Sequence, residues 1–264
     1  MLKQRIITAC ILAIVFIGTI LFASHDWVRI MFAIFLGVSF YELSELTIKP
    51  GKTGSVVIGV CSATALWFWG ASLETEVIKF QSLAGALLWL GTAMFFFVYR
   101  FSGQWSITIR SLFFLIGVSM LWICITSLIY LHGHTPNGGW VVLYLMTLVW
   151  IADIGAYFSG RRFGKNKLAP GISPGKTWEG VIGGLAVNIL WMLLIYSQTA
   201  LLNVSLTWFI AIGLATSAIS VVGDLFESIL KREAGVKDSG KILPGHGGVL
   251  DRFDSIIAAA PVFL

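Results

Sequence analysis

Charged residues are scarce in this chain: Asp, Glu, Lys and Arg make up 12% of its 264 residues, about half of their usual share in soluble domains. Cysteine is scarce too, and Cys10, Cys61 and Cys124 show no Cys-x-x-Cys spacing, which argues against a disulfide framework or a metal or redox centre. We expect these three to be small, buried apolar residues. No inverted pair of broken helices is visible either, which argues against a secondary transporter.

Apolar residues are abundant and fall in long runs. Hydrophobic residues make up 57% of the chain, and a helix that crosses a bilayer needs about 20 mostly apolar residues. Eight such runs predict an all-α, polytopic membrane protein: 5–24, 27–48, 54–73, 77–99, 110–131, 140–160, 178–197 and 204–224. A ninth run begins near residue 249 and reaches Leu264 after about 16 residues. We therefore expect the last helix to be truncated and the native C-terminus to lie beyond Leu264.

The basic residues follow the alternation of these runs. Sixteen of the 18 Lys and Arg residues lie at the N-terminus or in every second link, with Arg29 and Lys79 as the exceptions. Because basic residues in short links are retained in the cytoplasm, the pattern predicts about nine transmembrane helices and a cytoplasmic N-terminus. The links 161–177 and 228–252 hold ten of these bases, so we expect the chemistry at the cytoplasmic face.

Unusual polar residues concentrate in the second half of the chain. We expect residues 1–135 to be membrane anchor and packing helices, and residues 136–264 to be the catalytic membrane region. Glu42 and Glu45 are three residues apart on one helical face of the first half. We interpret both as side chains that extend to the membrane interface beside Lys49.

Two small-residue patterns predict where helices meet. Gly160-x-x-x-Gly164 and Gly180-x-x-x-Gly184 leave narrow faces on which two helices can approach closely. Such an approach would bring the two basic links side by side.

Four acidic residues in or beside the apolar runs are candidates for a metal site. An acid as deep in its run as Asp153 costs roughly 2.5–3.5 kcal/mol unless it faces a polar cavity. Asp224 ends the eighth run, while Asp251 and Asp254 share a helical face where the ninth begins. Magnesium prefers one or two carboxylates together with water and substrate phosphates. The pattern favours Mg²⁺ at these acids over the alternatives, which are ion pairs with neighbouring bases and, for Asp153, a structural hydrogen bond.

Glycines and bases around these acids indicate phosphate binding. Gly247 and Gly248 free the backbone to approach an anion closely. Lys176 lies in Ser173-Pro-Gly-Lys-Thr177, which is not a Walker motif, because Pro170 stands at the position of the required glycine and no strand is expected before it. Lys176 can still bind phosphate as a cation. The other candidates for catalysis or phosphate neutralisation are Lys231, Arg232, Lys237, Asp238, His246 and Arg252.

The segment from Ser228 to Asp254 resembles the signature of the phosphatidate cytidylyltransferases, also called CDP-diacylglycerol synthases. The matching positions are Ser228-x₂-Lys231-Arg232-x₄-Lys237-Asp238-x₅-Pro244-x-His246-Gly-Gly-x₂-Asp251-Arg252-x-Asp254. Asp153-x-Gly-Ala-Tyr157 with Gly160-Arg-Arg, and Ser173-Pro-x-Lys176-Thr-Trp-Glu-Gly180, resemble further segments of that family. The resemblance is close over roughly residues 150–264 and extends to the first half only in its hydrophobic layout.

The resemblance implies a reaction in which CTP and phosphatidic acid give CDP-diacylglycerol and pyrophosphate with Mg²⁺, a second cation being left open. It implies an enzyme of phospholipid biosynthesis in the bacterial inner membrane, with its site toward the cytoplasm. It also implies membrane lipids, and not nucleic acid, as interaction partners. Whether the protein forms a homodimer is left open. Asp224 and Asp251 would bind the metal with support from Asp254. A CTP-dependent polyprenol kinase, which would release CDP, and a transporter stay as alternatives.

Overall fold

Each apolar run folds as a helix, since a helix satisfies its backbone hydrogen bonds internally. The structure is a computed structural model that describes residues 2–70, 72–99, 105–198, 201–202, 204–243, 245 and 247–264, with side chains from residue 10 onward except 97 and 198. Within these residues nine helices form, namely α1 (Leu2–Phe22), α2 (His25–Leu46), α3 (Lys52–Trp69), α4 (Thr75–Val98), α5 (Ile107–His134), α6 (Gly138–Phe163), α7 (Trp178–Gln198), α8 (Leu206–Ala234) and α9 (Leu250–Phe263). Each predicted run corresponds to one of them.

In the part of the chain that the structure describes, six helices are long and apolar enough to cross a membrane: α2, α4, α5, α6, α7 and α8. The described part of α1 adds a shorter apolar helix, Cys10–Phe22. The chain is therefore a helical integral membrane protein with several apolar helices. The number of nine crossings stays a prediction.

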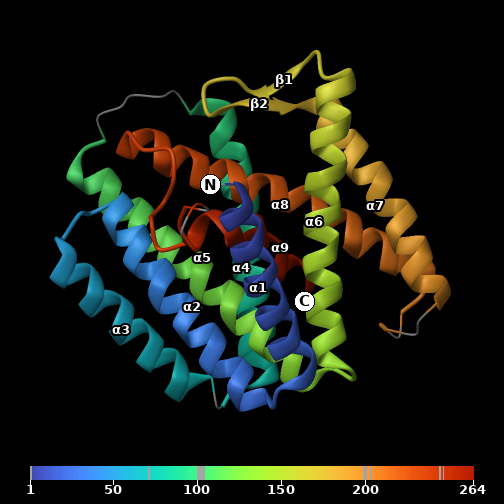
Figure 1. The fold of residues 1–264 in the computed structure, drawn as a ribbon, viewed down its shortest axis with the longest axis horizontal. Coiled ribbons are helices and arrows are strands. Elements are labelled where there is room, and N and C mark those ends of the chain that lie inside the picture. The colour runs from blue at the N-terminus through green and yellow to red at the C-terminus, as the bar shows by residue number, and fades with distance from the viewer. Residues whose placement is uncertain are drawn as a thin grey trace.

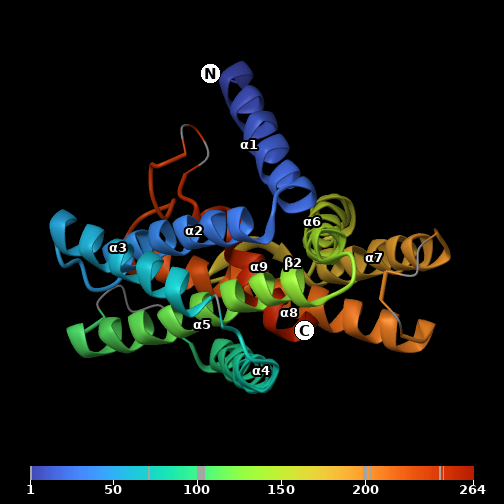
Figure 2. The same ribbon diagram turned by 90° about the horizontal axis from the view of Figure 1, so that it is seen from below.

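Helix α9 lies near the middle of the molecule, as both views show (Figures 1 and 2). It packs against α4, α5 and α8, and also contacts α2 and α6. Ala258, Ala259 and Ala260 are fully buried, and their small side chains let the surrounding helices approach α9. The start of α9 is therefore fixed relative to both halves of the chain.

Some of the connections between helices can be placed at one of two opposite edges of the fold in Figure 1. The turns that join α1 to α2 and α5 to α6 lie at the lower edge of Figure 1, whereas the strands that follow α6 lie at its upper edge. This arrangement agrees with the alternation of the basic links.

Helix α8 continues beyond the predicted end of its run at 224 and reaches Ala234. Leu225, Ile229 and Leu230 are buried along this extension, so packing maintains the helix after hydropathy has fallen. Gly235, with φ of +73°, then ends it in the left-handed conformation that glycine adopts easily. The predicted link 228–252 is therefore wrong in its bounds, because α8 continues to Ala234 and α9 already begins at Leu250.

A β-hairpin connects α6 to α7. Strands β1 (Lys167–Ala169) and β2 (Ser173–Thr177) pair antiparallel, with Lys167 opposite Thr177. The expectation that no strand precedes Lys176 is therefore wrong, and the all-α class holds apart from this hairpin. An antiparallel hairpin is still not the strand–loop–helix of a phosphate-binding Walker motif.

The cysteines differ from the prediction in part. Cys124 is buried, but Cys10 and Cys61 are exposed. These two lie on outward faces of α1 and α3, where a residue of the same polarity can contact lipid instead of protein. Spacing along an apolar run does not distinguish these two environments.

Helices α6 and α7 approach closely at glycines, as the small-residue patterns predict. A Cβ atom at Gly180 would lie 3.4 Å from the Cα atom of Gly160, and one at Gly155 would lie 3.0 Å from the Cα atom of Gly184. At Gly184 it would lie 3.3 Å from the Cβ atom of Ala156. Side chains larger than hydrogen would separate the two helices.

We predict that Gly184→Leu destabilises the protein by about 1–3 kcal/mol, the usual cost of overpacking. Gly91→Leu is the matched control, because a Cβ atom at Gly91 has no neighbour within 4 Å. Thermal denaturation in detergent, followed by the loss of monodisperse protein, should show a lower midpoint for Gly184→Leu only. Equal midpoints for the two variants would contradict the close approach.

Candidate active site

Asp153, Lys176 and Asp224 line one cavity of about 450 Å³, which we call the α6 cavity. Its walls come from α6, β2, α7 and α8. The Nζ atom of Lys176 lies 2.5 Å from Oδ2 of Asp224, and the charges of both residues act on Asp153. The deep acid of α6 therefore faces a polar cavity, as its cost in lipid requires.

A second cavity of about 280 Å³, the loop cavity, is lined by Ser228, Lys231, Arg232, Lys237, Asp238, Asp251 and Arg252. It lies one helical turn further along α8 than the α6 cavity. Ser228 marks the boundary, because its hydroxyl donates a hydrogen bond of 3.3 Å to Oδ1 of Asp224. Most of the predicted phosphate-binding residues thus gather in two neighbouring cavities.

The hairpin that carries Lys176 is held at both ends. At its base, Glu179 accepts hydrogen bonds from the backbone N–H of Lys165 and Asn166 and from the Asn166 side chain. At its tip, Nε of Arg232 donates to the carbonyl oxygen of Ile172 at 3.3 Å. The tip also packs on α8 through Ile172 and Ile229. Contact between the two basic links, expected from the sequence, is thereby confirmed.

Asp251 connects α9 to α8 and to the loop between them. Its Oδ1 atom lies 2.7 Å from Nζ of Lys231. Its Oδ2 atom accepts hydrogen bonds from the backbone N–H of Ser239 at 2.8 Å, from the Ser239 hydroxyl at 2.9 Å and from the Gly248 N–H at 2.8 Å. Both carboxylate oxygens therefore have protein partners, and the backbone N–H of Gly248 points to this carboxylate.

Glu227 was not among the predicted site residues. It is 2% exposed, and its Oε2 atom lies 2.9 Å from Nζ of Lys231. The charge of Asp254, on α9, acts on Glu227 from the other side. The sequence contained a signal for it, because Glu227 lies three residues after Asp224 and four before Lys231 on one helical stripe.

Glu42 corrects a second interpretation. It does not extend to the interface but is 1% exposed, and it accepts hydrogen bonds from the N–H groups of Val249 at 3.1 Å and Leu250 at 2.8 Å. The first amides of a helix have no partner within it, and a carboxylate satisfies them well. Glu45 accepts a hydrogen bond from the Ser55 hydroxyl of α3. Glu42 and Val249 are 207 residues apart, so no local sequence pattern could indicate their contact.

The site fits a divalent cation in one part only. Among the described residues, no group of three or more His, Cys, Asp or Glu side chains is arranged to hold a metal. Asp153 and Asp224 nevertheless face the same cavity, and Mg²⁺ commonly takes one or two carboxylates with water and phosphate oxygens. These two residues fit that requirement, whereas the oxygens of Asp251 are bound within the protein. His246 lies outside the described residues.

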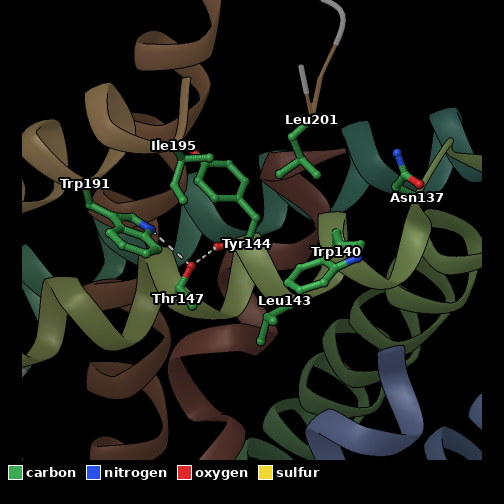
Figure 3. Close-up of a pocket in the computed structure, with 8 residues that line it drawn as sticks. All are labelled: Asn137, Trp140, Leu143, Tyr144, Thr147, Trp191, Ile195 and Leu201. Atoms are coloured by element: carbon green, nitrogen blue, oxygen red, sulfur yellow. Dashed lines mark hydrogen bonds between the residues drawn. The ribbon is translucent and has the colours of Figure 1, made fainter. Parts of the chain in front are cut away.

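Another cavity, of about 590 Å³, lies away from these residues between α6, α7 and residue 201 (Figure 3). Trp140, Thr147 and Trp191 contribute to its wall, and Nε1 of Trp191 donates to the Thr147 hydroxyl at 3.1 Å. Its lining, as far as the structure describes it, contains no charged side chain. It is therefore unsuited to binding phosphate.

The fold and the two cavities define an integral membrane protein that gathers cations and carboxylates at one end of its helices. Comparison with known families gives the finer class: the model of the cytidylyltransferase family matches residues 3–264. The chain belongs to the cytidylyltransferase family.

Similar relatives extend over the whole chain. The phosphatidate cytidylyltransferase of Haemophilus influenzae is 40% identical over 286 residues, covering 100% of this chain and 97% of the relative. That of Pseudomonas aeruginosa is 37% identical over 270 residues, with coverage of 100% and 96%. That of Bacillus subtilis is 32% identical over 265 residues, with coverage of 98% and 95%.

We predict that Lys231→Met destabilises the protein by about 3 kcal/mol, because it leaves Glu227 and Asp251 without their cation. The Lys231 side chain is 14% exposed, so we expect a loss of stability at the lower end of the range for breaking a buried ion pair. Lys79→Met is the control, since Lys79 pairs with Glu76 at the exposed surface. The thermal midpoint of Lys79→Met should equal that of the unmodified protein. An unchanged midpoint for Lys231→Met would contradict the structural role of the buried pair.

Proposed function

We propose that this chain transfers the cytidylyl group of CTP to phosphatidic acid, giving CDP-diacylglycerol and pyrophosphate for phospholipid biosynthesis. The observation that carries the proposal is the adjacency of two cavities along α8, one with carboxylates and Lys176, the other rich in bases. Such a pair suits a reaction between two phosphate groups. The names of full-length relatives support the same activity.

The reaction needs little covalent chemistry from the protein. A phosphate oxygen of phosphatidic acid attacks the α-phosphorus of CTP and forms a new P–O bond. The bond from this phosphorus to the bridging oxygen of the β-phosphate breaks, and pyrophosphate leaves. Because the second pKa of a phosphate monoester is near 6, the attacking oxygen is largely anionic at neutral pH and needs no general base.

The bases of the loop cavity would neutralise the phosphates. We assign this role to Lys231, Arg232, Lys237 and Arg252, and in the α6 cavity to Lys176. Asp238 and His246 remain further candidates for catalysis, and Gly247 and Gly248 for close approach of the backbone to phosphate. Electrostatic stabilisation of this kind is the main contribution that proteins make to phosphoryl transfer.

Asp153 and Asp224 are the residues that we propose to hold Mg²⁺, with support from Asp254. When bound, the ion would offset the negative charge of the CTP phosphates. Asp251 satisfies Lys231 and the loop in the described structure, so we assign it to holding the loop rather than to binding the ion. A second cation and a homodimer stay open.

We further propose about nine crossings, with the N-terminus and both cavities on the cytoplasmic side of a bacterial inner membrane. The distribution of Lys and Arg supports this orientation. Residues 136–264 would form the catalytic region and residues 1–135 the anchor. Glu42 is an exception, because it belongs to the anchor but contacts Val249 and Leu250 of the catalytic region.

The test is to incubate purified protein with labelled CTP, phosphatidic acid and Mg²⁺ and to identify the products. Formation of CDP-diacylglycerol with an equal amount of pyrophosphate is the expected result. Release of CDP with a phosphorylated lipid would point to a lipid kinase. Uptake of substrate into liposomes without any product would point to a transporter.

We predict that Asp224→Asn lowers kcat about 100-fold or more, because a charge that acts in the transition state is lost. Asp26→Asn is the matched control, since Asp26 pairs with Arg29 and its side chain is 71% exposed. The control should keep the kcat of the unmodified protein. Near-normal turnover by Asp224→Asn would refute its assignment.

We predict that Asp153→Asn raises the Mg²⁺ concentration needed for half-maximal activity by about tenfold, because the ion loses a charged ligand. Turnover measured at a series of Mg²⁺ concentrations provides the value. An unchanged Mg²⁺ dependence would remove Asp153 from the metal site.

A further inference from the structure

Glu42 joins the first half of the chain to the start of α9. Its Oε1 atom accepts the N–H of Val249, and its Oε2 atom accepts the N–H of Leu250. The hydroxyl oxygen of Ser239 lies 3.3 Å from Oε2. One buried side chain of α2 thus binds the loop Gly235–Val249 near its beginning and at its end.

Two glycines of the loop leave room for this carboxylate. A Cβ atom at Gly240 would lie 2.9 Å from Cδ of Glu42, and one at Gly248 would lie 2.6 Å from its Oε1 atom. Real Cβ atoms do not approach other groups so closely, so a side chain at either position would displace the Glu42 carboxylate. The loop backbone therefore closes around Glu42, which is a second observation independent of the hydrogen bonds.

The contacts continue from Glu42 into the loop cavity. The Ser239 hydroxyl lies within hydrogen-bonding distance of both Glu42 and Asp251, and Asp251 pairs with Lys231. Asp238 directly precedes Ser239, and Arg252 follows Leu250 by two residues. The groups that Glu42 holds are therefore the immediate neighbours of residues that line this cavity.

We propose that Glu42 is a positioning residue for the transfer reaction: it fixes the loop Gly235–Val249 and the start of α9, and thereby the cations of the loop cavity. This inference rests on the proposed function. Glu42 touches no reacting group and acts through Ser239, Val249 and Leu250. A loop held only at its ends would sample many positions, and its cations would then bind the substrate phosphates less tightly than preorganised ones.

The test compares Glu42→Gln with Glu45→Gln. Both Glu42 oxygens accept hydrogen bonds, and a Gln side chain has only one acceptor oxygen, so the variant must lose a contact. Glu45 uses Oε1 for the Ser55 hydroxyl, which a Gln oxygen can replace. Each variant is purified in detergent, and three quantities are measured: kcat, the KM of each substrate, and amide hydrogen exchange over residues 236–250.

For Glu42→Gln we expect hydrogen exchange in that segment to rise at least tenfold. We also expect the KM of one substrate, the one whose phosphates the loop cavity binds, to rise at least fivefold, while the other KM stays within twofold. Glu45→Gln should match the unmodified protein in every quantity. Unchanged exchange in Glu42→Gln, or a lower kcat with both KM values unchanged, would overturn the proposal, since the latter indicates only less active protein.

If Glu42→Gln does not fold, Ser239→Ala replaces it, because this change removes the hydroxyl contacts of Ser239 with Glu42 and Asp251 and leaves both backbone contacts of Glu42. Raised exchange with a selective rise of one KM supports the proposal, and values equal to those of the unmodified protein overturn it. The exchange measurement needs no turnover. Failure of the unmodified protein to make CDP-diacylglycerol therefore refutes the proposed function, and is distinguishable from failure of Glu42 to hold the loop.

Discussion

The arrangement of this end of the molecule depends on one ion pair, between Lys231 of α8 and Asp251 of α9. A buried charge without partners is costly in an apolar environment, and here each charge has several partners. Lys231 contacts Glu227 and Asp251, while Asp251 also binds Ser239 and Gly248. Because these residues come from two helices and the loop between them, satisfying the charges fixes the relative position of all three.

This constraint explains why the two cavities have different characters. In the α6 cavity, Lys176 and Asp224 retain partial exposure and can exchange their mutual contact for substrate or cation. In the loop cavity, Asp251 is 7% exposed and is paired with Lys231, so neither of these two charges is readily exchanged for a ligand. A divalent cation would therefore match Asp153 and Asp224 better than Asp251, whereas the family resemblance implied Asp224 and Asp251.

The sequence predicted those features that have a local physical signature. Nine apolar runs correspond to nine helices among the described residues, and the depth of Asp153 indicated the cavity that it lines with Lys176 and Asp224. Hydropathy could not locate the end of α8, because packing of Ile229 and Leu230 continues the helix after the apolar run ends. Nor could it separate an exposed Cys61 from a buried Cys124. The role of Glu42 depends on a tertiary contact and has no local signature.

The glycines of the loop illustrate how one pattern can have two physical causes. A Gly-Gly pair beside bases favours a phosphate cradle, since glycine lets backbone amides approach an anion. In the structure the anions next to Gly248 are carboxylates of the protein itself: its N–H binds Asp251, and its lack of a side chain admits Glu42. The chemistry that the pattern indicates, an anion held against bare backbone, is the same in both cases. Only the tertiary structure identifies which anion is held, and here the anions are the carboxylates of Asp251 and Glu42.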